Sequence, residues 1–206
     1  MGNAPKLCAY DKMHIKIFDW YLLIINIVGF ILYIVNWLLY KYTVDKQVDA
    51  FLTIVSLMGG SAGILIAILM FDRKAEKENM MSRIFVACVF VIQVVLLLII
   101  KGYLGETITL AFWKFFDKHK VLLIYLFVIN FVTFAAFAVD KIAAIERKSR
   151  IRIVTLLGLS FIGGSLGALI AMYLLRHKTK KDYFTVGVPL TMVMQVVVIF
   201  FLMNMK

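Results

Sequence analysis

Long apolar stretches alternate with short charged segments along the whole chain. None of the 23 basic and 12 acidic residues falls within six apolar stretches. These stretches are 20–40, 50–71, 84–100, 121–139, 153–175 and 183–205. Each is close to the roughly 20 residues that a helix needs to cross the hydrocarbon core of a bilayer. The pattern therefore predicts an all-α membrane protein with six transmembrane helices.

Composition strengthens this prediction, because 63% of the 206 residues are hydrophobic and only 17% are charged. Soluble domains average about 45–50% apolar and roughly 25% charged residues, so a water-soluble fold is excluded. The two cysteines, Cys8 before the first stretch and Cys88 inside the third, indicate neither a disulfide framework nor a metal cluster. The first stretch is longer than the apolar run of a cleavable signal, and we expect it to be retained.

The sequence matches itself at an offset of 104 residues, including at polar and glycine positions. The matches pair Tyr21 with Tyr125, Asn26 with Asn130, Gly59-Gly60-Ser61 with Gly163-Gly164-Ser165, and Gly63 with Gly167. After a slip of two residues, Gln93 meets Gln195. We interpret this as an internal duplication of a three-helix unit. The predicted parts are an N-terminal polar segment 1–19, repeat 20–100, linker 101–120 and repeat 121–206.

The linker contains an amphipathic segment, 102–117. Its apolar face carries Ile108 and Phe112, and its polar face carries Glu106 and Lys114. Because charged side chains are costly in hydrocarbon, we favour a helix in the head-group plane over a seventh crossing. Two pseudo-symmetric repeats of three crossings would then be inverted relative to each other, as in many secondary transporters. A seventh crossing would make them parallel.

The net charge of +11 suggests contact with anions. Basic residues in short loops between apolar helices serve membrane orientation and lipid binding, so we do not expect a nucleic-acid partner. In the six-crossing arrangement, thirteen basic residues lie on the N-terminal side and ten on the other. This bias leaves the orientation open.

Small residues recur on one face of the second helix of each repeat. They are Gly59, Gly60 and Gly63 in the first repeat and Gly163, Gly164 and Gly167 in the second. We favour close helix packing as their role. The alternative is that the paired glycines break the helix near the middle of the membrane and expose backbone groups to a substrate. Ser61 and Ser165 would supply hydroxyl groups in either case.

A basic segment follows the fifth apolar stretch and contains Arg176, His177, Lys178 and Lys180. Asp140 and Lys141 lie at the end of the fourth stretch, followed by further basic residues up to Arg152. Anionic lipid head groups are the partners we favour for these charges. A specific anionic solute or a protein partner is the alternative. Together with Ser61 and Ser165, Asp140, Lys141 and the four residues of the basic segment are the candidate binding residues.

Amide side chains also lie inside the predicted helices. The paired amides, Asn26 with Asn130 and Gln93 with Gln195, more often join helices by hydrogen bonds than line a polar pathway. We predict no cofactor and no metal, and we assign no catalytic residue. The protein is not expected to be an enzyme, although Asp140, His177 and the lysines would form a site for lipid chemistry if the basic loop folded back.

The second half resembles the bacterial membrane family called domain of unknown function 1294. The resemblance rests on Asn130 to Phe134, Asp140-Lys141, Gly163 to Ala168, and Arg176-His177-Lys178-Thr179-Lys180. The first half resembles it as a degenerate copy, because Asn36-Trp37 replaces Asp140-Lys141. The resemblance implies a multi-pass protein of a prokaryotic cytoplasmic membrane and no known activity.

Two hypotheses for function remain open. In the first, which we favour from the sequence, the protein is a small transporter or permeation-type protein for an anionic solute or lipid. In the second, it is a non-transporting assembly or anchoring subunit that binds lipid head groups or a partner protein. Anionic membrane lipids are the expected partners in both, and a homo-oligomer or a protein partner remains open.

Overall fold

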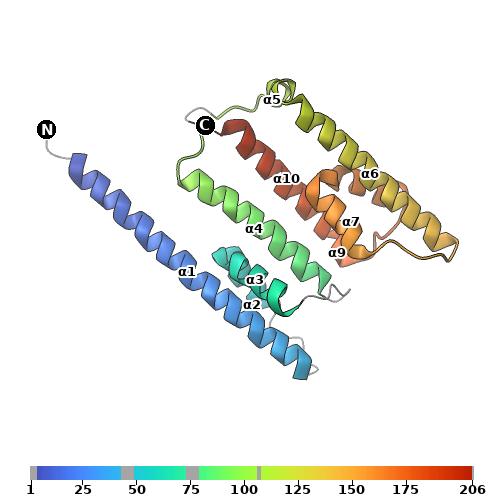
Figure 1. The fold of residues 1–206 in the computed structure, drawn as a ribbon, viewed down its shortest axis with the longest axis horizontal. Coiled ribbons are helices and arrows are strands. Elements are labelled where there is room, and N and C mark those ends of the chain that lie inside the picture. Colours follow the sequence, from blue (N-terminus) through green and yellow to red (C-terminus); the bar gives the residue numbers. More distant parts are fainter. Residues whose placement is uncertain (1–3, 43–48, 73–78, 106–107, 206) are drawn as a thin grey trace. The chain divides into compact units, whose positions relative to one another are not determined.

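The structure is a computed structural model that describes residues 4–42, 49–72, 79–105 and 108–205. Within these ranges it is all-helical, apart from one isolated antiparallel bridge between Leu104 and Met205. Six of the described segments have the length and hydropathy to cross a membrane, as predicted. They are Ile17–Leu39, Ala50–Phe71, Met80–Ile100, Lys120–Ile145, Ile153–Leu174 and Asp182–Asn204. The chain forms two compact units, Met1–Lys74 and Ala75–Lys206 (Figure 1).

The first unit contains one long helix and two short ones. Helix α1 spans Ala4–Tyr42, so it runs from the polar segment 1–19 into the first apolar stretch without a break. Helix α2, a π-helical turn η1 and helix α3 pack against it. They span Asp49–Val55, Ser56–Gly60 and Ser61–Phe71.

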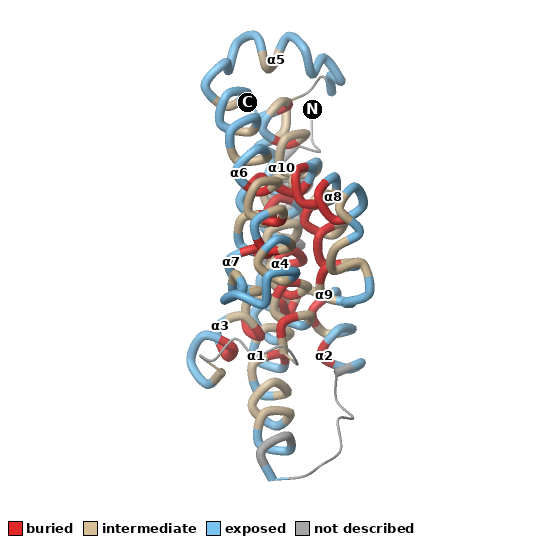
Figure 2. Tube along the Cα trace, turned by 90° about the vertical axis from the view of Figure 1, so that its right-hand side faces the viewer, coloured by how far each residue is buried: buried red, intermediate tan, exposed pale blue. Residues whose placement is uncertain are grey.

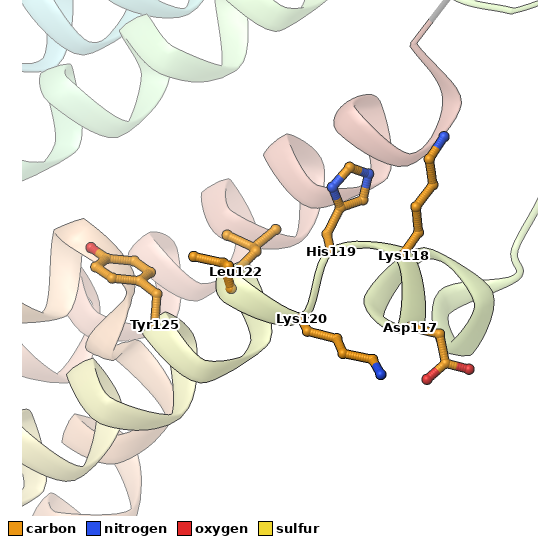
Figure 3. A pocket seen from close by; sticks show the side chains of 7 residues that line it. Asp117, Lys118, His119, Lys120, Leu122 and Tyr125 are labelled. Atoms are coloured by element: carbon orange, nitrogen blue, oxygen red, sulfur yellow. The ribbon is translucent and has the colours of Figure 1, made fainter.

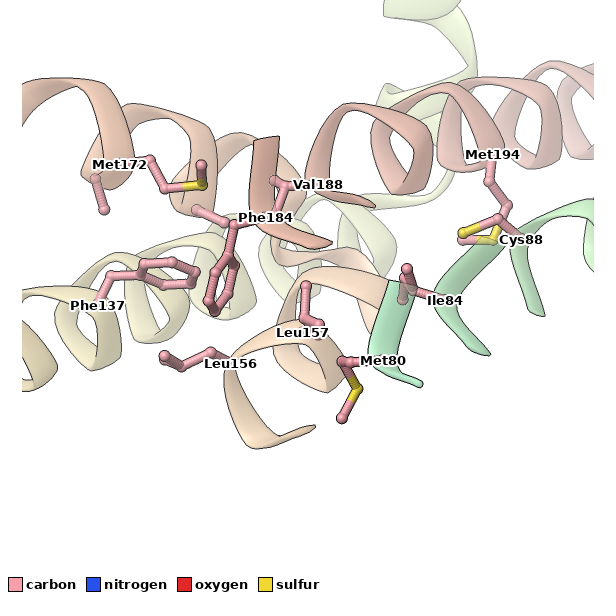
Figure 4. Close-up of a cluster of buried hydrophobic side chains, with 12 residues drawn as sticks. Met80, Ile84, Cys88, Phe137, Leu156, Leu157, Met172, Phe184, Val188 and Met194 are labelled. Carbon is pink, nitrogen blue, oxygen red and sulfur yellow. The ribbon is translucent and has the colours of Figure 1, made fainter. Parts of the chain in front are cut away.

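The second unit contains the remaining helices. They are α4 (Met80–Ile100), α5 (Phe112–Lys118), α6 (Lys120–Ile145), α7 (Ile153–Leu159), the π-helical turn η2 (Ser160–Gly164), α8 (Ser165–Leu174), α9 (Asp182–Thr185) and α10 (Gly187–Asn204). Buried residues, which Figure 2 draws in red, are frequent along η2 and α8. Phe184 lies at the centre of an apolar cluster with Phe137, Leu156 and Met172 (Figure 4), and its ring centroid is 5.6 Å from that of Phe137. This cluster joins α6, α7, α8 and α9 into one core.

The apolar segment Ile153–Leu174 is not a straight helix. At Gly163 the backbone has φ 136°, in the left-handed region that glycine adopts readily, and α7 is thereby separated from α8. A straight helix of 22 residues would be about 33 Å long. Instead, the backbone just before α7 and the side chains just after α8 all bind the carboxylate of Asp140. The segment therefore folds back on itself as a helical hairpin that begins and ends beside the same residue of α6.

The first unit contains a hairpin of the same kind. Gly59 has φ 117° and separates α2 from α3. Gly29 on α1 faces Val55 of α2 and Ile64 of α3, so both arms pass the same point of α1. At the open end, the Tyr33 hydroxyl donates to Asp72 at 3.1 Å. The segment Ala50–Phe71 therefore also returns towards the end from which it started.

Helices α4 and α10 of the second unit run in the same direction. Met80 and Ile84 at the start of α4 belong to the same buried cluster as Phe184 and Val188 at the start of α10. Just after α4, the Gly105 N–H donates to the Asn204 carbonyl, at the end of α10, at 2.7 Å. The two helices therefore begin together and end together.

The linker contains a shorter helix than the sequence suggests. Helix α5 covers seven residues, whereas the amphipathic pattern extended over 102–117. Seven residues are too few to cross a bilayer, which takes about 20. The position of α5 in the head-group plane remains a prediction. Helix α4, the third of the first sequence repeat, packs against α10, so the compact units and the sequence repeats divide the chain differently.

Candidate functional site

The tip of the second hairpin is closed by side chains of α6 and α10. Carbonyl groups near a helix end lack their usual partners in the helix, and four of them at this break, from Ser160 to Gly163, accept hydrogen bonds from side chains. Gln195 donates to the Ser160 and Phe161 carbonyls at 2.6 and 3.2 Å. Tyr125 donates to the Ile162 carbonyl at 2.6 Å, and Asn130 donates to the Gly163 carbonyl at 2.9 Å. The helix break is therefore satisfied within the protein.

Asn130 also fixes the returning arm of the hairpin. Its side-chain oxygen accepts a hydrogen bond of 2.7 Å from the Gly167 N–H. A Cβ atom on Gly167 would lie 2.0 Å from the Asn130 backbone carbonyl, so only glycine fits there. Asn26 and Gly63 repeat this contact in the first unit, with a hydrogen bond of 2.8 Å and a Cβ position 1.9 Å from the Asn26 carbonyl. The sequence pairs of the two repeats thus make matching contacts.

The two candidate serines lie inside the protein. Ser165 is 1% exposed and its hydroxyl donates to the Gln195 side-chain oxygen. Ser61 is 0% exposed. Both serines are placed at the first residue of the returning helix, where packing covers them.

Asp140 is the centre of a polar cluster at the open end of the second hairpin. Its side chain is 0% exposed. Its Oδ2 atom lies 2.8 Å from His177 Nε2 and 2.7 Å from Lys178 Nζ, and its Oδ1 accepts a hydrogen bond of 3.0 Å from the Ile151 N–H. A buried carboxylate needs such donors to offset the loss of hydration. Asp140 therefore ties the loop before α7 and the loop after α8 to the end of α6.

Lys178 is held between a charge and an aromatic ring. Its ammonium group lies 4.7 Å from the centroid of the Phe184 ring, in addition to its contact with Asp140. Burial lowers the pKa of Lys178 below its ordinary value, and the neighbouring Asp140 opposes this shift. The positive charge of Arg150 also lowers the pKa of Lys178, which places Arg150 in its electrostatic neighbourhood.

The loop after α8 begins with a tight C-terminal cap. The His177 N–H donates to the Met172 carbonyl at 3.0 Å, and the Arg176 N–H donates to the Tyr173 carbonyl at 3.3 Å. This is the Schellman pattern, in which the residue at the Arg176 position is usually glycine. Arg176 has φ 45° and Lys178 has φ 62°. Non-glycine residues in this region cost roughly 1–3 kcal/mol and are concentrated at functional sites.

The structure brings most of the predicted binding residues together. Asp140, His177 and Lys178 are in direct contact, and Lys141 donates to the Leu175 carbonyl at the end of α8. Arg176 and Lys180, in the same loop, are exposed. Ser165 lies at the far end of the hairpin and Ser61 belongs to the first unit.

Sequence reasoning did not include three contributors to this cluster. The Ile151 contact is made by its backbone, which carries no sequence signal. Phe184 looked like one more apolar residue of the last helix, although it lies beneath Lys178. Arg150 was grouped with the general loop charge, and the contact of its neighbour Ile151 with Asp140 places it at the site.

A shallow hollow of about 650 Å³ lies at the junction of α5 and α6 (Figure 3). It is lined by Lys118, His119, Lys120 and Tyr125, among others. It lies at the opposite end of α6 from Asp140, so it is separate from the polar cluster. Among the described residues, no group of three His, Cys, Asp or Glu side chains is placed to hold a metal ion.

Six apolar helical segments, two glycine-broken hairpins and a basic polar cluster at a helix end define a multi-pass helical membrane protein. Residues 130–184 match the family described as protein of unknown function (DUF1294). The chain is also 37% identical over 75 residues to the uncharacterized protein YsdA of Bacillus subtilis (strain 168). That match covers 36% of this chain and 84% of YsdA, and the chain belongs to this family. No solved structure matches the chain.

Proposed function

We propose that the protein crosses the membrane four times and carries two re-entrant hairpins. The crossing helices are α1, α4, α6 and α10, and the hairpins are the segments Ala50–Phe71 and Ile153–Leu174. This arrangement accounts for the parallel direction of α4 and α10, because second and fourth crossings run the same way. As the third and sixth of six crossings they would be antiparallel. Each repeat then has two crossings, so the inverted relation expected from three crossings no longer follows.

The distribution of charge gives this topology an orientation. Ten Lys and Arg residues between positions 79 and 205 lie at the end of the second unit where the hairpin opens, against four at the other end. The ten are Arg83, Lys141, Arg147, Lys148, Arg150, Arg152, Arg176, Lys178, Lys180 and Lys181. Basic loops remain on the cytoplasmic side of membrane proteins. The hairpin of the second unit is thus proposed to open towards the cytoplasm.

The proposed duplication is supported by matching contacts in the two units. Tyr21 donates to the Met58 carbonyl and Tyr125 to the Ile162 carbonyl, at 2.8 and 2.6 Å. The 75 matched residues cover 84% of YsdA. YsdA is therefore shorter than half of this chain and close to one repeat in length. The first repeat has Asn36 in place of Asp140. The polar cluster is therefore specific to the second repeat.

We infer that the second repeat binds anionic lipid head groups through the loop after α8, as a membrane-embedded, non-transporting subunit. One observation carries this proposal: Arg176 and Lys180 are exposed in the same loop as His177 and Lys178, the two side chains that contact the buried carboxylate of Asp140. The positive charge of Arg176 and Lys180 therefore remains available for phosphate groups at the membrane surface. Each such side chain contributes about 1 kcal/mol near an anionic leaflet. Ser61 and Ser165 take no part, since both are covered by packing.

The test compares lipid binding by the purified protein and two double variants. Binding to the native state raises the free energy of unfolding by RT ln(1 + [L]/Kd), so tighter binding at the same lipid concentration gives a higher unfolding temperature. Phosphatidylglycerol should stabilise the wild type in phosphatidylcholine nanodiscs. Arg176→Gln with Lys180→Gln should reduce this effect, whereas Lys118→Gln with Lys120→Gln, at the other end of α6, should retain it. Equal stability with and without phosphatidylglycerol would refute lipid binding at this loop.

Transport of an anionic solute is the second candidate, and the two hairpins favour it. Re-entrant segments in membrane proteins often line substrate pathways, because irregular backbone is tolerated where it is buried or faces a cavity. The closed tip of the second hairpin is the reason for ranking transport below lipid binding. Flux of phosphate or sulfate into proteoliposomes that requires this protein and is lost on Gln195→Leu would reverse the order.

A further inference from the structure

Asp140 aligns two basic segments that lie far apart in the sequence. Its Oδ1 atom accepts a hydrogen bond from the backbone N–H of Ile151, which lies between Arg150 and Arg152 in the sequence. Its Oδ2 atom contacts the side chains of His177 and Lys178, which lie between Arg176 and Lys180 in the sequence. We propose that Arg150, Arg152, Arg176 and Lys180 together form a binding site for the phosphate monoester of a lipid head group. This inference rests on the proposed lipid binding and identifies its ligand class.

Within the described residues, the four basic side chains of this site are not paired with acidic side chains. Arg150, Arg152, Arg176 and Lys180 are all exposed, and none of them forms an ion pair there. Of the nearby acidic residues, Asp140 is buried under His177 and Lys178, and Glu146 is paired with Lys148 at 2.7 Å. Asp182 is exposed and is the remaining acid close in sequence. The exposed surface of the two loops is therefore strongly cationic.

The two loops are near each other by two separate criteria. The first is geometric, since one carboxylate has a contact to each loop. The second is electrostatic, since the charge of Arg150 acts on Lys178. Asp140 is in this account a positioning residue: it holds the two loops in place and its own charge is hidden from a ligand.

The composition of the site selects among anions. Three guanidinium groups can each donate paired hydrogen bonds to phosphate oxygens, which a lysine cannot do. A phosphate monoester has up to two negative charges and three terminal oxygens near neutral pH, whereas a phosphodiester has one charge and two. Four cations therefore match a monoester such as phosphatidate better than a diester such as phosphatidylglycerol.

The test measures the affinity of the full-length protein for phosphatidate and for phosphatidylglycerol in phosphatidylcholine nanodiscs. We expect the wild type to prefer phosphatidate by about tenfold or more, as charge-assisted hydrogen bonds to phosphate imply. Arg150→Gln with Arg152→Gln should remove this preference, because it should weaken the binding of phosphatidate more than that of phosphatidylglycerol. Lys118→Gln with Lys120→Gln serves as the charge-matched control and should keep the preference. Inorganic phosphate is added as a competitor, and competition would extend the site to free phosphate.

The outcomes separate this inference from the proposed function. Equal affinity for the two lipids, or a preference that survives loss of Arg150 and Arg152, would overturn the monoester site while lipid binding stands. If the affinity for phosphatidate and for phosphatidylglycerol were no higher than that for phosphatidylcholine, both proposals would be overturned. Circular dichroism of each variant shows whether a lost affinity reflects a lost fold, and a variant that unfolds is replaced by the single change Arg152→Gln.

Discussion

The carboxylate of Asp140 accepts a hydrogen bond of 3.0 Å from the backbone N–H of Ile151, eleven residues further along the chain. The same carboxylate contacts His177 and Lys178 beyond the hairpin. Since both ends of a 22-residue apolar segment meet at one side chain, that segment cannot run straight from one face of a membrane to the other. This relationship determines the proposed topology and the proposed site.

Asp140→Asn should destabilise the protein strongly. The change removes the charge that faces Lys178 while leaving that ammonium group in a mostly buried position, with 15% of its side chain exposed. Breaking one partner of a buried ion pair costs about 3–5 kcal/mol. We expect a large drop in the midpoint of thermal unfolding in detergent.

Glu146→Gln is the matched control for this change. It breaks the pair between Glu146 and Lys148, whose side chains are 47% and 73% exposed. Exposed pairs contribute about 0–1 kcal/mol, so the midpoint should hardly move. A similar drop for both variants would contradict a special role for Asp140.

Gly163→Ala should destabilise the second hairpin. The backbone at Gly163 has φ 136°, and an added Cβ would meet Ile129 at 3.1 Å. The strain of such a conformation is about 1–3 kcal/mol. Gly158→Ala in α7 is the control, because nothing lies within 4 Å of its added Cβ. That helical position should be stabilised by about 0.5–1 kcal/mol, and the two variants should therefore shift the unfolding midpoint in opposite directions.

Asn130→Leu should loosen the tip of the hairpin. The change removes the donor to the Gly163 carbonyl and the acceptor for the Gly167 N–H. Buried groups left without partners cost about 1–3 kcal/mol each. Hydrogen exchange followed by mass spectrometry should show faster exchange in peptides that cover residues 163–170. Unchanged exchange there would show that Asn130 does not hold the tip.

Much of the fold follows from the spacing of charges. The six apolar stretches become the six helical segments because an uncharged apolar run of about 20 residues is typical of a helix within a bilayer. The folding back of two of them was not predictable from length and hydropathy, since straight and folded segments have the same composition. The signals were local: the pair Gly163-Gly164, and the amide of Asn130 one helix earlier. They were also consistent with simple helix packing, which was the interpretation favoured from the sequence.

The candidate site was predictable in its side chains and not in its geometry. The basic segment and Asp140 were recognisable as charges beside apolar helices. Their direct contact depends on the hairpin, since a straight fifth helix would carry His177 away from Asp140. Ile151 contributes a backbone group, and Arg150 gains its place only through that contact.

The membrane sidedness of three loops tests the central claim most directly. Single cysteines are introduced by Lys118→Cys, Lys148→Cys and Lys180→Cys in a variant that lacks Cys8 and Cys88, and are labelled with a membrane-impermeant maleimide in sealed vesicles of each orientation. With re-entrant hairpins, the thiols of the Lys148→Cys and Lys180→Cys variants should be labelled from the same face, and the thiol of the Lys118→Cys variant from the opposite one. Labelling of the Lys180→Cys variant from the same face as the Lys118→Cys variant, with the Lys148→Cys variant labelled from the other, would contradict the account.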